Sequence, residues 1–236
     1  MLAAHGAQRA QPGLITVYPQ EKAFVPVACQ LQSVMVQPWS AQTEFPGKFT
    51  ALLIGPGLAS QDLPDELKEM TRRIWLTSTA PVIADASALD WLPTGAIPKD
   101  AVRVITPHPG EAARLLKTTS ARVQADRPAA LREISRLLGN AWVVLKGHQT
   151  LIGRNEGDIF INPTGNPFLA QGGSGDTLSG YLAGLLAQPT LQADPALAIR
   201  YAVWQHGAAA DLLTRTRPNW TVEDLQQILG NASRFQ

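Results

Sequence analysis

Short apolar runs that alternate with amphipathic segments constrain this 236-residue chain more than any other feature of its sequence. The runs are rich in Val, Ile and Leu and are predicted to be strands, at residues 14–18, 34–36, 50–54, 82–84, 102–105 and 142–145. Strands that are apolar on both sides are typical of a parallel sheet covered by helices on both faces. The sequence therefore predicts an α/β fold, a three-layer α/β/α sandwich with a mostly parallel central sheet.

The segments between these runs carry the spacing of helices. Residues 64–76 and 128–138 place apolar side chains along one face, which is typical of an amphipathic helix. Further helices are predicted at residues 19–32, 111–116, 174–187, 195–213 and 221–229. Pro26 counts against an unbroken helix at residues 19–32, because proline removes a backbone donor. Residues 151–152 and 159–161 are expected to pair as an antiparallel hairpin.

The charge of the chain is nearly balanced, with 20 Lys and Arg residues against 19 Asp and Glu. No basic run is longer than Arg72-Arg73, so neither nucleic acid nor an anionic membrane is an expected partner. The most apolar stretches fall far short of the roughly 20 residues that a membrane-spanning helix needs. Charged residues make up only 17% of the chain, against a usual share of about 25%. Such a chain buries much of its surface in its core or hides some of it in an oligomer, and a homo-oligomer, a dimer or a tetramer, is expected.

Cysteine and histidine usage limits the redox and metal chemistry of the chain. Cys29 is the single cysteine, which excludes an intrachain disulfide and a cysteine-based zinc site and favours a reducing, cytoplasmic location. His5, His148 and His206 show no metal-ligand spacing, so no metal site built from protein ligands is expected. His206 lies in an alanine-rich helix and is expected to be a packed residue.

Unusual loops follow the predicted strands at the edge where ligands bind. In parallel sheets, ligands bind outside the carboxyl ends of the strands. The loops concerned are residues 55–57, Asp85, 106–111, 146–150 and 172–176. Their coincidence at one edge is the first indication of function.

Residues 172–176 combine a glycine-rich turn with the start of a helix. Gly172, Gly173 and Gly175 let backbone N–H groups turn toward one point, beside Ser174, and the helix N-terminus adds partial positive charge. This arrangement suits a transferring phosphoryl group, and Asp176 in the first helical turn can accept a proton from a substrate hydroxyl. The alternative is a plain glycine-rich turn, and the two interpretations are about equal until the stiff polar loop at residues 162–167 is added. The sequences GxxxxGK[ST] and GxGxxG are absent.

The loop Lys146-Gly147-His148-Gln149-Thr150 follows a predicted buried strand. Its glycine permits close backbone approach, and its lysine or threonine can reach phosphate oxygens of an adenine nucleotide. The alternative is a simple turn into the hairpin, which these residues alone favour.

Two prolines hold the backbone on either side of His108, in Thr106-Pro107-His108-Pro109-Gly110-Glu111. Such stiffness presents a side chain accurately to a ligand, and Glu111 can orient waters around a Mg²⁺ ion held mainly by phosphates. The alternative is a helix start with Pro109 at the first position and Glu111 favoured by the helix dipole. That alternative accounts for Pro109 and Glu111 but not for His108.

At these loops the chain resembles the ADP/ATP-dependent NAD(P)H-hydrate dehydratase family, a branch of the ribokinase-like superfamily. The matching motifs stand in the family's order: GPGLA (55–59), TPHPGE (106–111), VLKGHQT (144–150) and NPTGNPFLAQGGSGD (162–176). TPHPGE together with GNP and GGSGD is close to diagnostic. The resemblance covers about residue 14 to the end and implies one ribokinase-like domain over residues 1–236.

The resemblance implies a substrate, a co-substrate and a set of site residues. The substrate is the 6-hydroxylated form of NADH or NADPH (NADHX or NADPHX). ADP or ATP, with Mg²⁺, phosphorylates the hydroxyl; phosphate then leaves and the dihydropyridine is restored. The motif matches put Gly57, His108 and Glu111 at the hydrated nucleotide and Asp176 at the catalytic carboxylate. The residues they put at the adenine nucleotide are Lys146, Gly147, His148, Gln149, Thr150, Gly172, Gly173, Ser174 and Gly175.

The chain departs from the family pattern at three places. Ala59 and Phe168 stand where the family usually has glycine. Family members usually begin with a further strand, a glycine turn and a helix, and here Met1 falls inside that helix. The opening strand and its glycine turn are therefore expected to be missing.

Two other functions compete with dehydration. One is a related small-molecule kinase, for example of a vitamin precursor, which would use the same anion site and the same base. The other is a truncated, non-catalytic nucleotide binder. TPHPGE weighs against the kinase, and identification of the reaction product separates all three.

Overall fold

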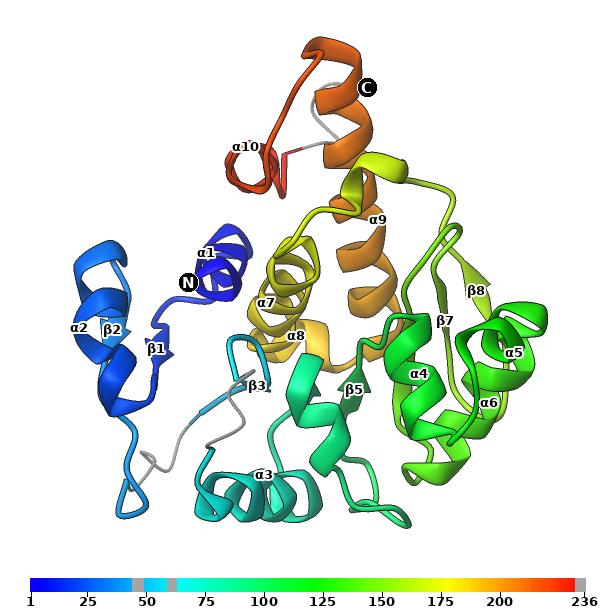
Figure 1. Cartoon of the computed structure of the whole chain (residues 1–236), viewed down its shortest axis with the longest axis horizontal. Helices are drawn as coiled ribbons and strands as arrows, with labels where there is room; N and C mark the ends of the chain where they lie inside the picture. The colour runs from blue at the N-terminus through cyan, green and yellow to red at the C-terminus, as the bar shows by residue number, and fades with distance from the viewer. Residues whose placement is uncertain (44–48, 59–62, 232–236) are drawn as a thin grey trace.

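Most of the predicted strands join one sheet within residues 1–43, 49–58 and 63–231, which the computed structural model describes (Figure 1). Its order is β3-β4-β5-β6-β7-β8. Strands β3 to β6 are parallel neighbours, with Ile54 opposite Ala84 and Ala84 opposite Ile105, and β7 and β8 extend the sheet as the predicted antiparallel hairpin. The strands are β3 (Leu52–Ile54), β4 (Val82–Ala84), β5 (Arg103–Ile105), β6 (Trp142–Leu145), β7 (Leu151–Gly153) and β8 (Phe160–Ile161). The α/β prediction is confirmed.

The first two apolar runs pair with each other and not with this sheet. Strand β1 (Thr16–Val17) is parallel to β2 (Met35–Val36), and α2 (Glu21–Gln30) connects them. Figure 1 shows this unit on the far side of the N-terminal helix from the main body. Contrary to expectation, α2 continues through Pro26. Since α2 buries none of its residues, water can satisfy the carbonyl that proline leaves without a donor.

Helices cover both faces of the six-stranded sheet. Alternate strand residues point to opposite faces, so that Ile83 and Val104 pack on one helix layer while Ala84 and Ile105 pack on the other. The first layer contains α7 (Ser174–Leu186), α9 (Pro195–Thr216) and α10 (Val222–Ile228), with the short α8 (Pro189–Gln192) between them in sequence. The second contains α3 (Asp65–Thr77), α4 (Pro109–Leu115), α5 (Ser120–Ala125) and α6 (Arg127–Leu137). Helix α5 was not predicted because it is only six residues long.

Helix α1 (Leu2–Arg9) packs directly on α7, and glycines make that close approach possible. A Cβ atom at Gly180 would lie 1.9 Å from the carbonyl oxygen of Ala3, and one at Gly6 would lie 2.3 Å from that of Thr177. The two backbones therefore touch with no side chain between them. None of the helices in the described ranges is long and apolar enough to cross a membrane.

Alanine at position 180 is expected to destabilise the fold by roughly 1–3 kcal/mol, the usual effect of overpacking. This loss of stability would be opposite in sign to the effect of helix propensity, which favours alanine over glycine by up to about 1 kcal/mol. Urea unfolding measures it, with Gly172→Ala as the control because a Cβ there meets no atom within 4 Å. Unchanged stability of Gly180→Ala would contradict so close a crossing.

Candidate functional site

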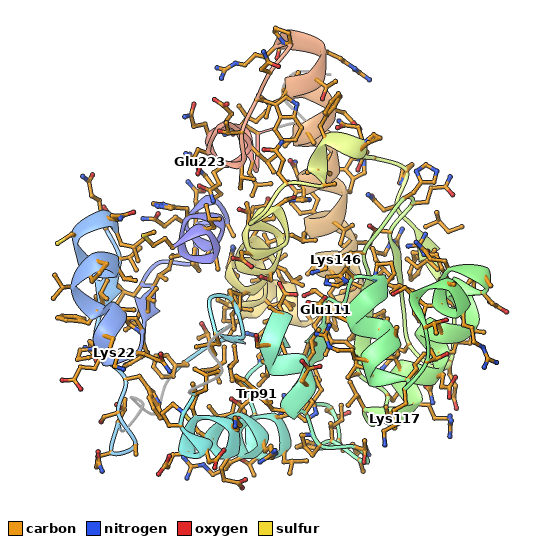
Figure 2. The ribbon with its side chains drawn as sticks, viewed as in Figure 1. Lys22, Trp91, Glu111, Lys117, Lys146 and Glu223 are labelled. Carbon is orange, nitrogen blue, oxygen red and sulfur yellow. The ribbon has the colours of Figure 1, made fainter. Side chains whose placement is uncertain are left out.

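The loops that follow β4, β5 and β6 meet the start of α7 at the carboxyl edge of the sheet. Lys146, the residue after β6, occupies the centre of this edge. Its Nζ lies 3.0 Å from Asp85 Oδ1 and 3.8 Å from Glu111 Oε2. Figure 2 shows Lys146 and Glu111 near each other beside α4. A Cβ at Gly175 would lie 3.1 Å from the same Nζ, so the ammonium group also borders the glycine-rich helix start.

Asp85 belongs to this cluster, although sequence reasoning assigned it no specific role. Its side chain is 2% exposed, and Lys146 provides the opposite charge that a buried carboxylate requires. Local backbone geometry fixes its place. A Cβ at Gly55 would lie 1.7 Å from the carbonyl oxygen of Asp85, and Ala86 adopts a left-handed φ of 51°. An acidic residue directly after a buried strand was the available signal.

The start of α4 explains His108 in a way that the sequence did not. His108 is the N-cap residue of this helix, and its Nδ1 accepts hydrogen bonds from the amides of Gly110 and Glu111 at 3.0 and 3.3 Å. Glu111 completes a capping box, because its Oε2 accepts from the His108 amide at 2.7 Å. The inference that a helix start leaves His108 unexplained is therefore wrong. Its side chain is still 52% exposed, so about half of it remains accessible at the site.

The start of α7 has the geometry that the glycines predicted. Gly173 is the N-cap residue and adopts a left-handed φ of 87°. Ser174 and Gly175 are the first helical residues, and Asp176 follows them in the first turn. Gly172 precedes them and is exposed. Unpaired amides at a helix start can bind an anion. The Ser174 amide donates to the carbonyl of Gln171 at 3.3 Å.

Asp176 is half-buried beside the lysine cluster. Burial raises the pKa of its carboxyl, and the neighbouring charge of Asp85 raises it further, while Lys146 opposes both effects. A carboxylate with a raised pKa takes up a proton more readily than an ordinary aspartate. The arrangement therefore joins a proton acceptor to an anion site, which are the two components that phosphoryl transfer to a hydroxyl needs.

His206 of α9 contacts the start of α7 as well as packing in the core. It is buried, as expected, but its Nε2 lies 3.1 Å from the carbonyl oxygen of Ser174 and 3.4 Å from its Oγ. Burial lowers the pKa of His206 to about 4, so the ring is neutral at ordinary pH. It thus ties the start of α7 to α9. A histidine among alanines was the only hint of this role in the sequence.

The polar loop before α7 is anchored to α9 by a residue that sequence reasoning missed. Asp211 accepts hydrogen bonds from the amide of Gly165 at 2.8 Å and from Nδ2 of Asn166 at 2.9 Å. Thr164 Oγ1 donates to the carbonyl of Trp204 at 2.9 Å. Phe168 follows in the short helix Pro167–Leu169 and is exposed.

The remaining predicted site residues lie at the same edge in unusual backbone conformations. Gly57 follows β3 with a φ of 79° and is exposed; Ala59 of the same motif lies outside the described residues. In the loop after β6, Gly147 has a φ of 136° and Gln149 a φ of 53°. His148 is exposed, and Thr150 Oγ1 donates to the carbonyl of Gly147 at 3.1 Å.

Fold and site together define a ribokinase-like α/β protein. A ribokinase-like superfamily protein from Enterococcus faecalis superposes with a TM-score of 0.78 at 26% identity, over 99% of this chain and 81% of that one. The family model described as NAD(P)H-hydrate dehydratase matches residues 1–231, and the chain belongs to this family.

Named relatives agree with this assignment. The chain is 49% identical over 138 residues to the ADP-dependent (S)-NAD(P)H-hydrate dehydratase of Neisseria meningitidis, a match that covers 56% of this chain and 45% of that protein. It also superposes with a TM-score of 0.83, at 31% identity, on the ADP/ATP-dependent NAD(P)H-hydrate dehydratase of Bacillus subtilis co-crystallized with ATP/Mg²⁺ and soaked with CoA. That match covers 100% of this chain and 86% of the other. Three of the curated relatives are matched over only 31% to 45% of their own length.

Substitution of His108 separates its capping role from a role at the ligand. His108→Asn keeps a good N-cap residue, whereas His108→Ala removes the cap and should cost about 1 kcal/mol of stability. If the ring also contacts the ligand, both variants should raise the KM for the hydrated nucleotide. Thermal melting and steady-state kinetics are the measurements. A wild-type KM in His108→Asn would show that His108 caps the helix and does not contact the ligand.

His206 is expected to make the fold sensitive to acid. Its folded pKa is about 4 and its ordinary value 6.5, so the unfolded chain binds the proton first as the pH falls. The stability tied to this group is fully present above about pH 6.5 and is lost as the pH approaches about 4. Urea unfolding across this range should show a smaller loss in His206→Gln than in the wild type. Parallel curves for the two proteins would contradict the assignment.

Proposed function

We propose that this protein dehydrates hydrated NADH or NADPH, NADHX or NADPHX, in a reaction that consumes ADP or ATP. Membership of the NAD(P)H-hydrate dehydratase family supports the reaction, and so do the names of the relatives in Neisseria and Bacillus. The reaction repairs a damaged cofactor, so its product is the intact dinucleotide.

The observation that carries the proposal is the position of Asp176. The carboxylate lies in the first turn of α7, directly after Gly173, Ser174 and Gly175. A phosphate bound at the helix start would lie within reach of the carboxylate. Burial and Asp85 raise its pKa, which brings its basicity closer to that needed for a general base near neutral pH.

The surrounding loops divide between the two ligands in this proposal. Gly57, His108 and Glu111 contact the hydrated nucleotide. The adenine nucleotide contacts the loop after β6 and the start of α7, through Lys146, Gly147, His148, Gln149, Thr150, Gly172, Gly173, Ser174 and Gly175. The common position of these loops at one sheet edge supports the division, because both ligands must meet at Asp176.

The proposed chemistry has two stages. In the first, the oxygen of the 6-hydroxyl attacks the terminal phosphorus of the nucleotide, and Asp176 accepts the proton of that hydroxyl. The bond from that phosphorus to the bridging oxygen breaks, which releases AMP from ADP or ADP from ATP. In the second, the C6–O bond breaks, inorganic phosphate leaves with the bonding electrons, and the neighbouring ring carbon loses a proton. The ring double bond is thereby restored.

The donor set at this edge fits a Mg²⁺ ion that arrives with the nucleotide. Mg²⁺ prefers oxygen ligands and is commonly held by one or two carboxylates together with substrate phosphates. Glu111 supplies a carboxylate next to Lys146 and would orient waters of an ion that the phosphates mainly hold. When bound, Mg²⁺ neutralises charge on the phosphates. The Bacillus subtilis relative was co-crystallized with ATP/Mg²⁺, which supports Mg²⁺ as the ion that accompanies the nucleotide.

Two further properties belong to the proposal. A homo-oligomer, dimer or tetramer, is supported by exposed apolar side chains, among them Leu197 and Tyr201 one turn apart on α9. A cytoplasmic location is supported by Cys29, a free and exposed thiol that suits a reducing compartment.

Replacement of the proposed base tests the mechanism. Asp176→Asn keeps the shape of the side chain but cannot accept the proton, so kcat should fall by about 10²–10⁴-fold. The assay follows NADH regenerated from its hydrate by absorbance, and mass spectrometry separates restored NADH from a phosphorylated product. Accumulation of the phosphorylated compound by the wild type would indicate a kinase instead. Near wild-type kcat in Asp176→Asn would remove this residue from the mechanism.

The same variant should be more stable than the wild type at neutral pH. Because the folded pKa of Asp176 is raised, its ionised form disfavours folding above that pKa, and the protonated form does not. The stability advantage of Asp176→Asn should therefore shrink as the pH falls through that raised pKa, and it should be gone below the ordinary pKa of an aspartate. An advantage that does not depend on pH would have another cause.

A further inference from the structure

The loop proposed to hold the adenine nucleotide is itself held by one arginine from outside it. Arg127 is the first residue of α6, after the N-cap Asp126, whose Oδ1 accepts from the amide of Ala129 at 2.9 Å. Nη2 of Arg127 donates to the carbonyl of Leu145 at 3.0 Å. Nη1 donates to the carbonyl of His148 and to that of Gln149, the latter at 3.4 Å.

These hydrogen bonds occupy carbonyl oxygens of the loop but do not involve its backbone amides. The amides of Gly147, His148 and Gln149 make no backbone hydrogen bond to another described residue. A phosphate is attracted by N–H groups and repelled by carbonyl oxygens. A loop whose carbonyls are bound and whose amides are unpaired therefore offers donors to an anionic ligand.

The backbone of this loop includes a conformation that is unfavourable on its own. Gln149 adopts a left-handed φ of 53°, which is unfavourable for a residue with a side chain. Gly147 adopts a φ of 136°, and a Cβ there would lie 3.3 Å from Nη2 of Arg127. The guanidinium thus packs against a backbone segment that only glycine follows easily.

We infer that Arg127 is a positioning residue for nucleotide binding. It acts through the backbone of residues 145–149, whose conformation it fixes. This inference rests on the proposed function, since it assumes that the loop after β6 contacts the adenine nucleotide. Lysine cannot replace the guanidinium, because a single ammonium group lacks the fork that reaches separate carbonyls.

The same helix carries a matched control. Arg132 is also half-buried and also binds carbonyls of a turn, through Nη1 to Arg154 at 3.3 Å and to Asn155 at 3.0 Å, and through Nη2 to Gly157 at 3.0 Å. That turn joins β7 to β8 and contains none of the proposed site residues. Substitution of either arginine removes the same kind of bond, but only Arg127 holds the proposed nucleotide loop.

The test compares Arg127→Lys and Arg132→Lys in the full chain. Titration calorimetry measures the Kd of ADP and ATP with its stoichiometry, which counts folded molecules, and thermal melting measures stability. Arg127→Lys should raise the Kd, and the KM for the nucleotide, by about tenfold, the scale of one lost charge-assisted hydrogen bond. Its KM for the hydrate should change far less. Arg132→Lys should lower the melting temperature without raising the nucleotide Kd.

Two outcomes would overturn the inference. One is an equal change in nucleotide Kd for both variants, and the other is a wild-type Kd in Arg127→Lys. Failure of the proposed function gives a different result. If the wild type binds ADP or ATP but leaves the hydrate unchanged, the dehydratase proposal fails while the calorimetric comparison still decides the role of Arg127.

Discussion

The ion pair between Lys146 and Asp85 is the contact on which the whole carboxyl edge depends. It joins the end of β6 to the end of β4, 61 residues away in sequence, and brings Glu111 of α4 to the same ammonium group. The Asp85 side chain is almost fully buried, so loss of the lysine would leave an unpaired charge, which typically costs roughly 3–5 kcal/mol. The left-handed Ala86 and the glycine at position 55 are the local conditions under which that carboxylate reaches its partner.

Around this pair the site is assembled from helix starts. Helix α4 begins at the capping box of His108, α6 at Asp126 and α7 at the left-handed Gly173. Each start brings the partial positive charge of a helix N-terminus to the edge of the sheet, while the caps of α4 and α6 occupy amides of their own first turns. Asp176 ionises in that setting, yet burial and the negative charge of Asp85 keep its pKa raised. The proposed base therefore takes up a proton more readily than an ordinary aspartate, and the positive charge of Lys146 opposes that effect.

Sequence patterns predicted the parts of this molecule that are encoded locally. Strands such as residues 82–84 could be predicted because they are short apolar runs. The tight start of α7 could be predicted from the glycines before Asp176. The partners of those parts could not. His206 and Ser174 are 32 residues apart, and no periodicity connects them. The capping role of His108 was missed because histidine is rarely an N-cap residue. The separation of β1 and β2 from the main sheet could not be predicted either. A short apolar segment indicates a strand, but it does not indicate which other strand it pairs with.

Two arginines of α6 hold the neighbouring loops through backbone carbonyls, and this affects which positions of the protein can be redesigned. Arg127 and Arg132 bind main-chain oxygens, which every amino acid possesses. The side chain of His148 takes no part in holding its own loop and is exposed. Position 148 can therefore accept many residue types while the loop keeps its course, which makes it the natural place for a library that alters the choice of nucleotide. Gly147, by contrast, is fixed by its backbone conformation and by the guanidinium beside it.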